Sequence, residues 1–293
     1  MATPASRPPT SMDATSPMSR KPEKPEKVGD LFAAFEGNRN FVMSFARGLE
    51  VIQSFNHEKR PMSVAHIARK CGLSRAAVRR FLITLELLGY VENVSGSYHL
   101  KASVLKLGSS YLTSTSLPAM AQPLLEQVSN LVHESASLST LDGNEIIYLA
   151  RHTRSRVISV GLSVGSRLPA YCTSMGRVLL AGLPPRQLSH YLTHVRLKRW
   201  TGKTVVSRTA LQALLAKAAN DGYALVDGEL ELGLRSIAVP VRAADGEIVA
   251  AMNVGAHAAA VTLEDMQRRF LPILLEHAQI LSRLLQMDPR ATT

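Results

Sequence analysis

The chain has 293 residues, of which 46% are hydrophobic and 19% are charged. At about 150 residues per domain this length suggests two domains, and the apolar content excludes a chain that is disordered throughout. The chain has only two cysteines, Cys71 and Cys172, about a hundred residues apart, which excludes a disulfide framework and a zinc site of the Cys-x-x-Cys type. The net charge of +11 favours an anionic partner.

The segment over residues 1–37 is typical of a disordered tail. It contains six of the fifteen prolines, with Ser, Thr, Lys and Glu around them. Such a composition cannot bury enough apolar surface to offset the entropy that is lost on ordering. The segment lacks the apolar region of a signal peptide, and no apolar run in the chain approaches the roughly 20 residues of a membrane-spanning helix. We therefore expect a cytoplasmic protein without a membrane partner.

Three helical patterns follow, two of them with capping residues at their starts. A helical apolar period begins near residue 40. Ser63 can cap a second helix, which Gly72 ends in a left-handed conformation, and Ser74 can cap a third helix, which Gly89 ends. The short turn between the last two helices is typical of a helix-turn-helix.

A hairpin completes this arrangement. Residues 90–93 and 97–100 alternate as two short strands around a Ser95-Gly96 turn. Residues 38–100, which hold the three helices and the hairpin, carry nine basic and four acidic side chains. A basic segment of this size predicts a winged helix-turn-helix domain that binds a double-stranded DNA operator.

The third helix carries arginines that we expect to face outward. Its apolar stripe packs against the other two helices, so the arginines one turn apart can reach guanine edges or phosphates in a major groove. The alternative is that they form only a solvated helix face. The candidate DNA-binding residues lie at the helix starts, along this outer face and at the hairpin tip: Ser63, Ser74, Arg75, Ala76, Arg79, Arg80, Ser95, Gly96 and Ser97.

After residue 100 the pattern mixes helices and strands, which favours an α+β domain around an antiparallel sheet. Residues 101–134 are helical in pattern with a break at Leu117-Pro118, so we expect a linker helix over 101–118 and a second domain over 119–288. The predicted strands cover 137–141, 145–150, 156–162, 236–241 and 248–254. The predicted helices cover 174–194, 208–221 and 262–286.

Several segments on both sides of residue 100 resemble one known family. The segments that carry the resemblance are ARGLEVIQSF (46–55), LLGYV (87–91), GSRLPAYCTSMGRVLLA (165–181) and ELELGLRSIAVPVR (229–242). They resemble the IclR family of transcriptional regulators. RAAVRRFLITLELLGY and LPAYCTSMGRVLLA look similar to its PcaR/PcaU/PobR subgroup, whose members control bacterial catabolism of 4-hydroxybenzoate and protocatechuate through the β-ketoadipate pathway.

The resemblance implies an N-terminal winged helix-turn-helix joined by a linker helix to a GAF-like effector domain. It also implies a homodimer or tetramer that binds a small, often acidic, metabolite. Members of the subgroup are mostly activators, which makes RNA polymerase a further expected partner. Two alternatives stay open: a repressor of the same architecture that answers to another metabolite, and a small-molecule sensor that acts through protein partners.

The segment 165–176 is the first part of the expected effector site. It places glycines and hydroxyls at the start of a helix, where backbone N–H groups suit a carboxylate. The alternative is a packed turn whose hydroxyls cap that helix. The resemblance implies that this loop lines the pocket, with Ala170, Tyr171, Thr173, Ser174 and Met175 as candidate residues.

The region 227–255 should supply the second part. The resemblance implies Ser236, Asn253 and Gly255 as effector-binding residues. Gly255 stands where a hydroxyl is usual in the family, and Val226 stands where an acidic residue is common in some members. This pattern disfavours a glyoxylate- or pyruvate-type ligand. A longer diacid or an aromatic acid, such as β-ketoadipate, 4-hydroxybenzoate or protocatechuate, is compatible with it.

A buried carboxylate needs a positive partner, and arginine is best suited because its fork binds carboxylates through two hydrogen bonds. We select Arg151 as this partner. The other candidates near the pocket segments are His152, Arg154, Arg156, Arg167 and Arg235. Arg235 precedes Ser236 in a strand, so alternation should point it to the opposite face.

Catalysis is not expected. The sequence has no GxSxG elbow, HExxH, P-loop or GxGxxG context. Cys172 more plausibly packs as a small hydrophobic residue than acts as a nucleophile. We expect no cofactor and no metal site.

Overall fold

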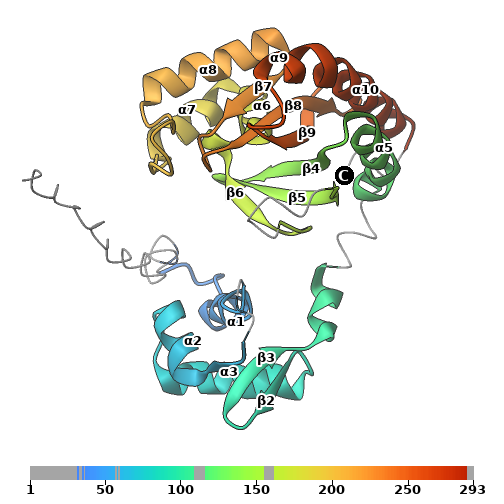
Figure 1. Cartoon of the computed structure of the whole chain (residues 1–293). Coiled ribbons are helices and arrows are strands. Elements are labelled where there is room, and N and C mark those ends of the chain that lie inside the picture. The colour runs from blue at the N-terminus through green and yellow to red at the C-terminus, as the bar shows by residue number, and fades with distance from the viewer. Residues whose placement is uncertain are drawn as a thin grey trace, which may run out of the picture. The chain divides into compact units, whose positions relative to one another are not determined.

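The computed structural model describes Phe32, Phe35 and residues 37–56, 58, 60–108, 116–154 and 162–288. The chain divides into two compact units, Met1–Lys106 and Leu107–Thr293, which are coloured along the chain in Figure 1. Most of the predicted tail over 1–37, most of the predicted strand over 156–162 and residues 109–115 of the predicted linker helix lie outside the described residues.

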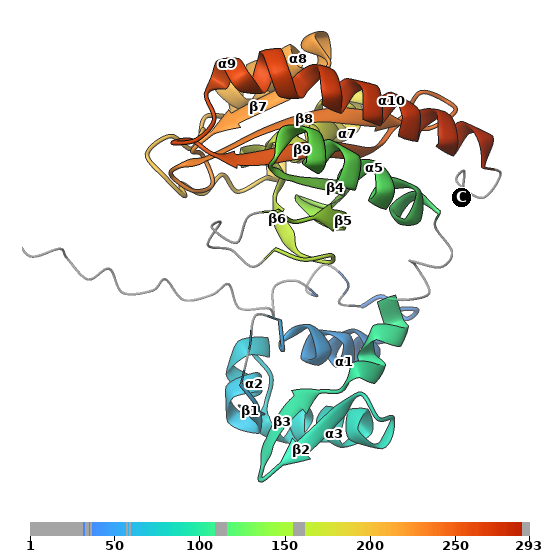
Figure 2. The same ribbon diagram turned by 45° about the vertical axis from the view of Figure 1, so that its right-hand side comes forward.

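The first unit packs three helices against a small sheet of three strands (Figure 2). Its core contains Val51, Ile67, Val78, Leu82 and Val91, all nearly inaccessible to solvent. Its elements are α1 (Met43–Gln53), β1 (Met62–Ser63), α2 (Val64–Cys71), α3 (Arg75–Leu87), β2 (Val91–Val94), β3 (Ser97–Leu100) and the short 3₁₀ helix η3 (Ala102–Val104). The sequence did not predict β1, which pairs with β3.

The second unit is built on one antiparallel sheet with the strand order β6-β5-β4-β9-β8-β7. The strands are β4 (Ser135–Asp142), β5 (Glu145–His152), β6 (Arg167–Pro169), β7 (Ala224–Asp227), β8 (Leu234–Arg242) and β9 (Ile248–His257). The helices are α5 (Leu117–Val132), η4 (Ala170–Cys172), α6 (Ser174–Ala181), α7 (Pro185–His194), α8 (Arg208–Asp221), α9 (Leu263–Asp265) and α10 (Leu271–Met287).

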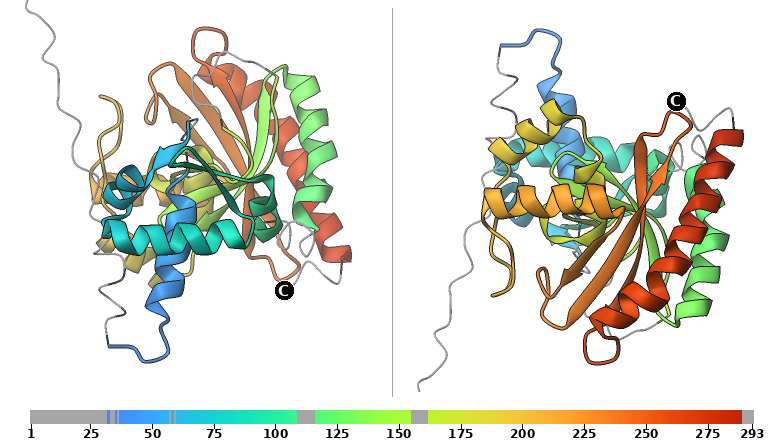
Figure 3. Two further views of the ribbon diagram at one scale, coloured as in Figure 1. Left: turned by 90° about the horizontal axis from the view of Figure 1, so that it is seen from below. Right: turned by 90° about the horizontal axis from the view of Figure 1, so that it is seen from above.

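Each face of this sheet has its own hydrophobic core. Helices α5 and α10 lie side by side along one face (Figure 3), where Val254 and Ala256 of β9 are buried. On the other face α6 and α8 cover Ala251 of β9 and Ala238 of β8. Side chains therefore alternate along β9 between the two cores, as strand geometry requires.

Two predicted helices are interrupted in the structure. The prediction of one helix over 174–194 was wrong, because α6 ends at Ala181 and α7 begins at Pro185. Proline cannot donate the backbone hydrogen bond that would continue a helix, and Ile248 lies close against Gly182. The helix predicted over 262–286 has a π-helical segment, Met266–Phe270, before α10.

The sequence analysis also missed β6 and β7, which are short edge strands of three and four residues. Their apolar alternation is too brief to give a period. Within the described residues, no helix is long and apolar enough to cross a membrane.

Candidate functional site

The two helices of the helix-turn-helix begin and end as their capping residues predict. The Ser63 hydroxyl accepts a hydrogen bond from the amide of His66 at 3.3 Å, and the Ser74 hydroxyl accepts one from the amide of Ala77 at 3.2 Å. Gly72, between the helices, has a left-handed φ of 66°. These caps satisfy amides that a helix start leaves unpaired, and they fix the direction in which α3 leaves the turn.

Helix α3 has one buried and one exposed face. Val78, Leu82 and Leu85 are buried in the core of the first unit. Arg75, Ala76, Arg79 and Arg80 are exposed. None of the three arginines has a carboxylate within ion-pair distance among the described residues. The helix therefore presents free guanidinium groups one turn apart, at its positively polarised N-terminal end.

The hairpin beside α3 closes with a tight turn. Ser95 and Gly96 both have positive φ values, 50° and 83°, which is the pattern of a type I′ turn. The side-chain oxygen of Asn93 accepts a hydrogen bond from the Gly96 amide at 2.9 Å, and its amide donates to the Tyr98 hydroxyl at 3.0 Å. The tip at Ser95 and Gly96 is exposed, and Ser97 is half-buried beside Ser63 of β1.

A cavity lies in the second unit, on the sheet face that α6 covers. The volume inside it that water-sized molecules can occupy is about 60 Å³. Cross-strand pairs form its floor: Ser135 and Ser236 flank Gly255, and Ser137 is opposite Asn253. The lining residues are Ser135, Ser137, Tyr148, Arg151, Leu162, Leu168, Cys172, Thr173, Ser174, Met175, Val226, Glu229, Leu230, Glu231, Leu234, Ser236, Asn253 and Gly255.

Two fully buried polar atoms in this lining have no hydrogen-bond partner among the described residues. They are the Ser174 hydroxyl and the Asn253 side-chain oxygen, both buried. By contrast, the neighbouring Thr173 hydroxyl accepts a hydrogen bond from the amide of Gly176 at 3.2 Å and caps α6. An unpaired buried polar atom costs free energy unless a ligand or water satisfies it.

Arg151 reaches the cavity because β5 contains a bulge. The pairing of β4 with β5 shifts at Leu138/Ser139, so that Tyr148 is opposite Ser139 and Arg151 is opposite Ser137. The extra residue places Tyr148 and Arg151 on the same face, although they are three positions apart. The Arg151 guanidinium donates to the Ser137 hydroxyl at 3.4 Å, and its carbon lies 5.7 Å from the centre of the Tyr148 ring.

The other candidate cations are engaged elsewhere. Arg167 pairs with Asp142 and Glu145, and Arg235 pairs with Asp227 at 2.6 Å. Arg154 donates to the side chain of Asn130 at 2.6 Å, and His152 lies opposite Ala136, whose side chain packs in the core on the other face. Arg156 lies outside the described residues. Arg151 is the only arginine or lysine that lines the cavity in the described part of the chain.

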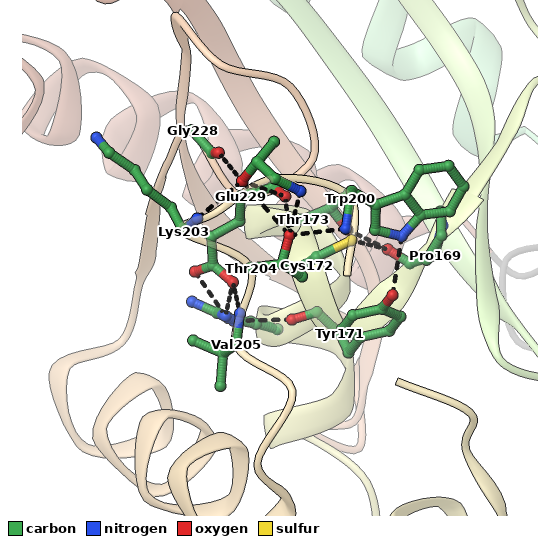
Figure 4. Close-up of polar contacts among 12 residues, drawn as sticks. Pro169, Tyr171, Cys172, Thr173, Trp200, Lys203, Thr204, Val205, Gly228 and Glu229 are labelled. Carbon is green, nitrogen blue, oxygen red and sulfur yellow. Dashed lines mark hydrogen bonds and ion pairs between the residues drawn. The ribbon is translucent and has the colours of Figure 1, made fainter. Parts of the chain in front are cut away.

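A buried ion pair supports one wall of the cavity. A nitrogen of the Arg177 guanidinium lies 2.7 Å from a carboxylate oxygen of Glu229, and the two side chains are only 4% and 8% exposed. The Glu229 carboxylate also accepts a hydrogen bond from the Val205 amide at 3.0 Å (Figure 4). The Thr204 hydroxyl donates to the backbone oxygen of Glu229 at 2.6 Å. Sequence analysis did not assign a role to this pair.

Ala170 and Tyr171 were predicted to line the pocket, but the structure places them behind its wall. Neither is among the residues that line the cavity. The Tyr171 hydroxyl instead donates to the backbone oxygen of Lys198 at 2.6 Å. It also accepts a hydrogen bond from the indole N–H of Trp200 at 2.8 Å (Figure 4). Ala170 lies against Gly176, where any side chain would collide with the Ala170 carbonyl. Side chains in a loop follow no regular period, so the sequence alone does not show which of them point into the cavity.

Burial raises the pKa of two side chains that line the cavity. It raises the pKa of Tyr148 to about 12 and that of the Cys172 thiol to about 12, the thiol also being near the Glu229 carboxylate. A protonated thiol is a poor nucleophile.

His190 and His194 lie one turn apart on α7, a spacing that the sequence analysis overlooked, but the described residues hold no group of three potential metal ligands.

Two family profiles match this chain, one in each unit. The profile described as "Bacterial transcriptional regulator IclR C-terminal" matches residues 109–283, and the one described as "IclR helix-turn-helix domain" matches residues 44–95. The chain belongs to the IclR family. It is therefore a DNA-binding transcriptional regulator and not an enzyme.

Within the IclR family the chain is similar to regulators of aromatic-acid catabolism. It is 48% identical to the Pca regulon regulatory protein of Pseudomonas putida over 83% of this chain and 84% of that protein. It is 33% identical to the p-hydroxybenzoate hydroxylase transcriptional activator of Acinetobacter baylyi over 84% and 92% of the two chains. The crystal structure of an IclR homolog complexed with 4-hydroxybenzoate from Microbacterium hydrocarbonoxydans is 28% identical, with a TM-score of 0.71 over 84% of this chain and 100% of that chain.

Seven of the nine residues predicted for the effector site of this IclR-family chain line the cavity: Arg151, Thr173, Ser174, Met175, Ser236, Asn253 and Gly255. Sequence analysis missed the serines of β4 and the ring of Tyr148. The signal that could have found Ser135 and Ser137 is their alternation in SASLST, with small polar residues at every second position.

Proposed function

We propose that this protein activates genes of aromatic-acid catabolism in response to a small carboxylic acid such as β-ketoadipate, 4-hydroxybenzoate or protocatechuate. Arg151 carries the proposal. It lines the cavity and has no carboxylate partner among the described residues. A guanidinium half-buried beside an aromatic ring is suited to bind a carboxylate from a ligand.

The rest of the cavity fits an acid with a flat or extended apolar body. Tyr148, Leu168, Met175 and Leu234 supply apolar surface in the lining. The free Ser174 hydroxyl and the free Asn253 oxygen offer hydrogen bonds to a second polar group of the ligand. The relative that was crystallised with 4-hydroxybenzoate supports an acid of this class.

We expect Arg151→Gln to weaken binding of the acid by about thirtyfold or more, because a carboxylate left without its charged partner in a buried site costs about 2–5 kcal/mol. The measurement is calorimetric titration with β-ketoadipate, 4-hydroxybenzoate, protocatechuate, pyruvate and glyoxylate. Arg167→Gln is the matched control, because Arg167 lies outside the cavity and pairs with Asp142 and Glu145. A wild-type protein that binds none of these acids would falsify the acid-sensing proposal.

Ser174→Ala and Asn253→Ala should each weaken acid binding by about tenfold while leaving the melting temperature of the free protein unchanged or higher. Removing an unsatisfied buried polar atom removes its desolvation cost, whereas the ligand loses a hydrogen bond. Ser129→Ala is the control with the opposite pattern. Its hydroxyl donates to the Glu134 backbone at 2.6 Å on the other side of the sheet, so its loss should lower stability and leave acid affinity intact.

We also propose how the protein assembles and how it activates transcription. The protein acts in the cytoplasm as a homodimer or tetramer, so that paired recognition helices bind a two-fold symmetric operator. As an activator it contacts RNA polymerase. If the acid and the operator are coupled, each changes the affinity of the other by the same factor. Light scattering of the full chain and in vitro transcription with RNA polymerase, with and without the acid, test these points.

A further inference from the structure

The segment over 195–207, which connects α7 to α8, contains no helix or strand. Long segments of this kind are uncommon in compact domains and often carry function. Residues 198–205, which we call the brace, are not among the described residues that line the cavity. The brace nevertheless contacts two walls that do line it: a first wall over 172–175 and a second wall over 226–234.

Tyr171 attaches the brace to the first wall. Its hydroxyl donates to the backbone oxygen of Lys198 at 2.6 Å and accepts from the Lys198 amide at 3.0 Å. It also accepts from the indole N–H of Trp200 at 2.8 Å. The hydroxyl is buried and makes all three of these hydrogen bonds to the brace. Cys172 and Thr173, the next residues along the chain, line the cavity.

Thr204 attaches the brace to the second wall. Its buried hydroxyl donates to the backbone oxygen of Glu229, which lines the cavity, at 2.6 Å. The same hydroxyl accepts from the amides of Trp200 at 3.0 Å and Thr201 at 2.8 Å. The Thr201 hydroxyl adds a hydrogen bond to the backbone oxygen of Gly228 at 2.7 Å. The second wall is therefore held through its backbone (Figure 4).

Trp200 takes part in both attachments. Its indole N–H donates to Tyr171, and its backbone N–H donates to Thr204. The side chain is 45% exposed, so burial in a hydrophobic core does not fix its position. The two hydrogen bonds fix it instead, together with the Lys198 ammonium group, which lies 4.8 Å from the centre of the ring. The position of this one residue thus depends on both walls.

A buried hydroxyl that makes all its hydrogen bonds to one segment holds that segment in place, because breaking any of them leaves a buried polar group unpaired. We infer that Trp200 and Thr204 are positioning residues of the effector site. The brace sets the spacing between the two walls, and an acid that contacts both walls shifts the brace and the surroundings of the indole. This inference rests on the proposed acid-binding function and names the residues that prepare its site.

The emission of Trp200 tests the inference in the wild-type protein. The chain has one tryptophan, so fluorescence excited beyond the absorption of tyrosine comes from this side chain alone. Titration with the acid that the wild type binds should change the emission with the same dissociation constant that calorimetry gives. In Arg151→Gln the change should move to at least thirtyfold higher acid, in step with the weaker binding expected there. Light absorption by the acid itself would be the same in both proteins.

Two substitutions at Thr204 separate the hydroxyl from the shape of the side chain. Thr204→Val leaves the partners of the hydroxyl unpaired and should lower the melting temperature by about 3–8 °C. It should weaken every acid that the wild type binds by one common factor, about three- to tenfold, because it lowers the fraction of correctly spaced sites and removes no contact to the ligand. Thr204→Ser keeps the hydroxyl and should restore both affinity and emission response.

Thr193→Val is the matched control. The Thr193 hydroxyl donates to the Ser189 backbone oxygen at 2.8 Å within α7, outside the brace and the cavity lining. Its loss should change neither acid affinity nor the emission response. Thermal denaturation, calorimetric titration and tryptophan emission of the full chain give the readouts for all variants.

The outcomes separate this inference from the function on which it rests. If the wild type binds none of the five acids, the acid-sensing proposal fails. If calorimetry shows binding while the emission of Trp200 stays constant, the inference is overturned and the function stands. Equal acid affinity in Thr204→Val and the wild type also overturns it, because the brace then serves stability alone. If Thr204→Val does not fold, the emission titration of the wild type decides.

Discussion

Replacing Arg75 and Arg79 together with alanine should weaken operator binding by about thirtyfold or more, because each arginine contact to a guanine or a phosphate contributes about 1–3 kcal/mol. Both side chains are exposed on α3 and have no ion pair within the described residues, so the substitution costs the fold little. Fluorescence anisotropy with a duplex selected from random sequence by the wild-type protein measures the loss.

The salt dependence of the same titration assigns the contacts. If an arginine binds a phosphate, its removal lowers the slope of log affinity against log salt by about one, whereas loss of a base contact leaves the slope unchanged. Arg268→Ala with Arg269→Ala is the matched control, because it removes the same charge from two exposed arginines of the second unit. Equal operator affinity in the Arg75/Arg79 variant and the wild type would contradict the assignment of α3 as the recognition helix, and acid binding should be intact in both variants.

The second large effect is expected at the buried ion pair. Arg177→Met should lower the free energy of unfolding by about 3–5 kcal/mol, because it leaves the Glu229 carboxylate buried without its partner. For a domain of this size the melting temperature should fall by about 10 °C. Acid binding should weaken as well, since Glu229 and Leu230 line the cavity.

A double-mutant cycle separates the charge from the shape. Arg177→Met with Glu229→Leu removes both charges and should be destabilised by less than the sum of the single variants. Lys217→Ala breaks the exposed Lys217–Asp221 pair and should leave the melting temperature within about 1 °C of the wild type. If the single variants at Arg177 and Glu229 behave like Lys217→Ala, the pair does not support the wall of the cavity.

Much of the DNA-binding unit could be predicted because its signals are local. Ser63 and Ser74 cap helices by bonding to amides three residues away, and Ser95-Gly96 forms a turn within four residues. Such interactions depend only on neighbouring residues, so they can be predicted from the local sequence. The break between α6 and α7 is also a local signal, because Gly182 and two prolines mark it in the sequence.

The cavity depended on contacts between distant segments. The sequence by itself determined the family, the alternation of small polar residues on β4 and β9, and the presence of a glycine at position 255. Only the tertiary structure decided that the bulge in β5 turns Arg151 toward the cavity, that Tyr171 binds the Lys198–Trp200 segment instead, and that Arg177 meets Glu229 across 52 positions of the chain. A bulge, a loop direction and a buried ion pair are set by the partner strand or loop, and no local pattern encodes that partner.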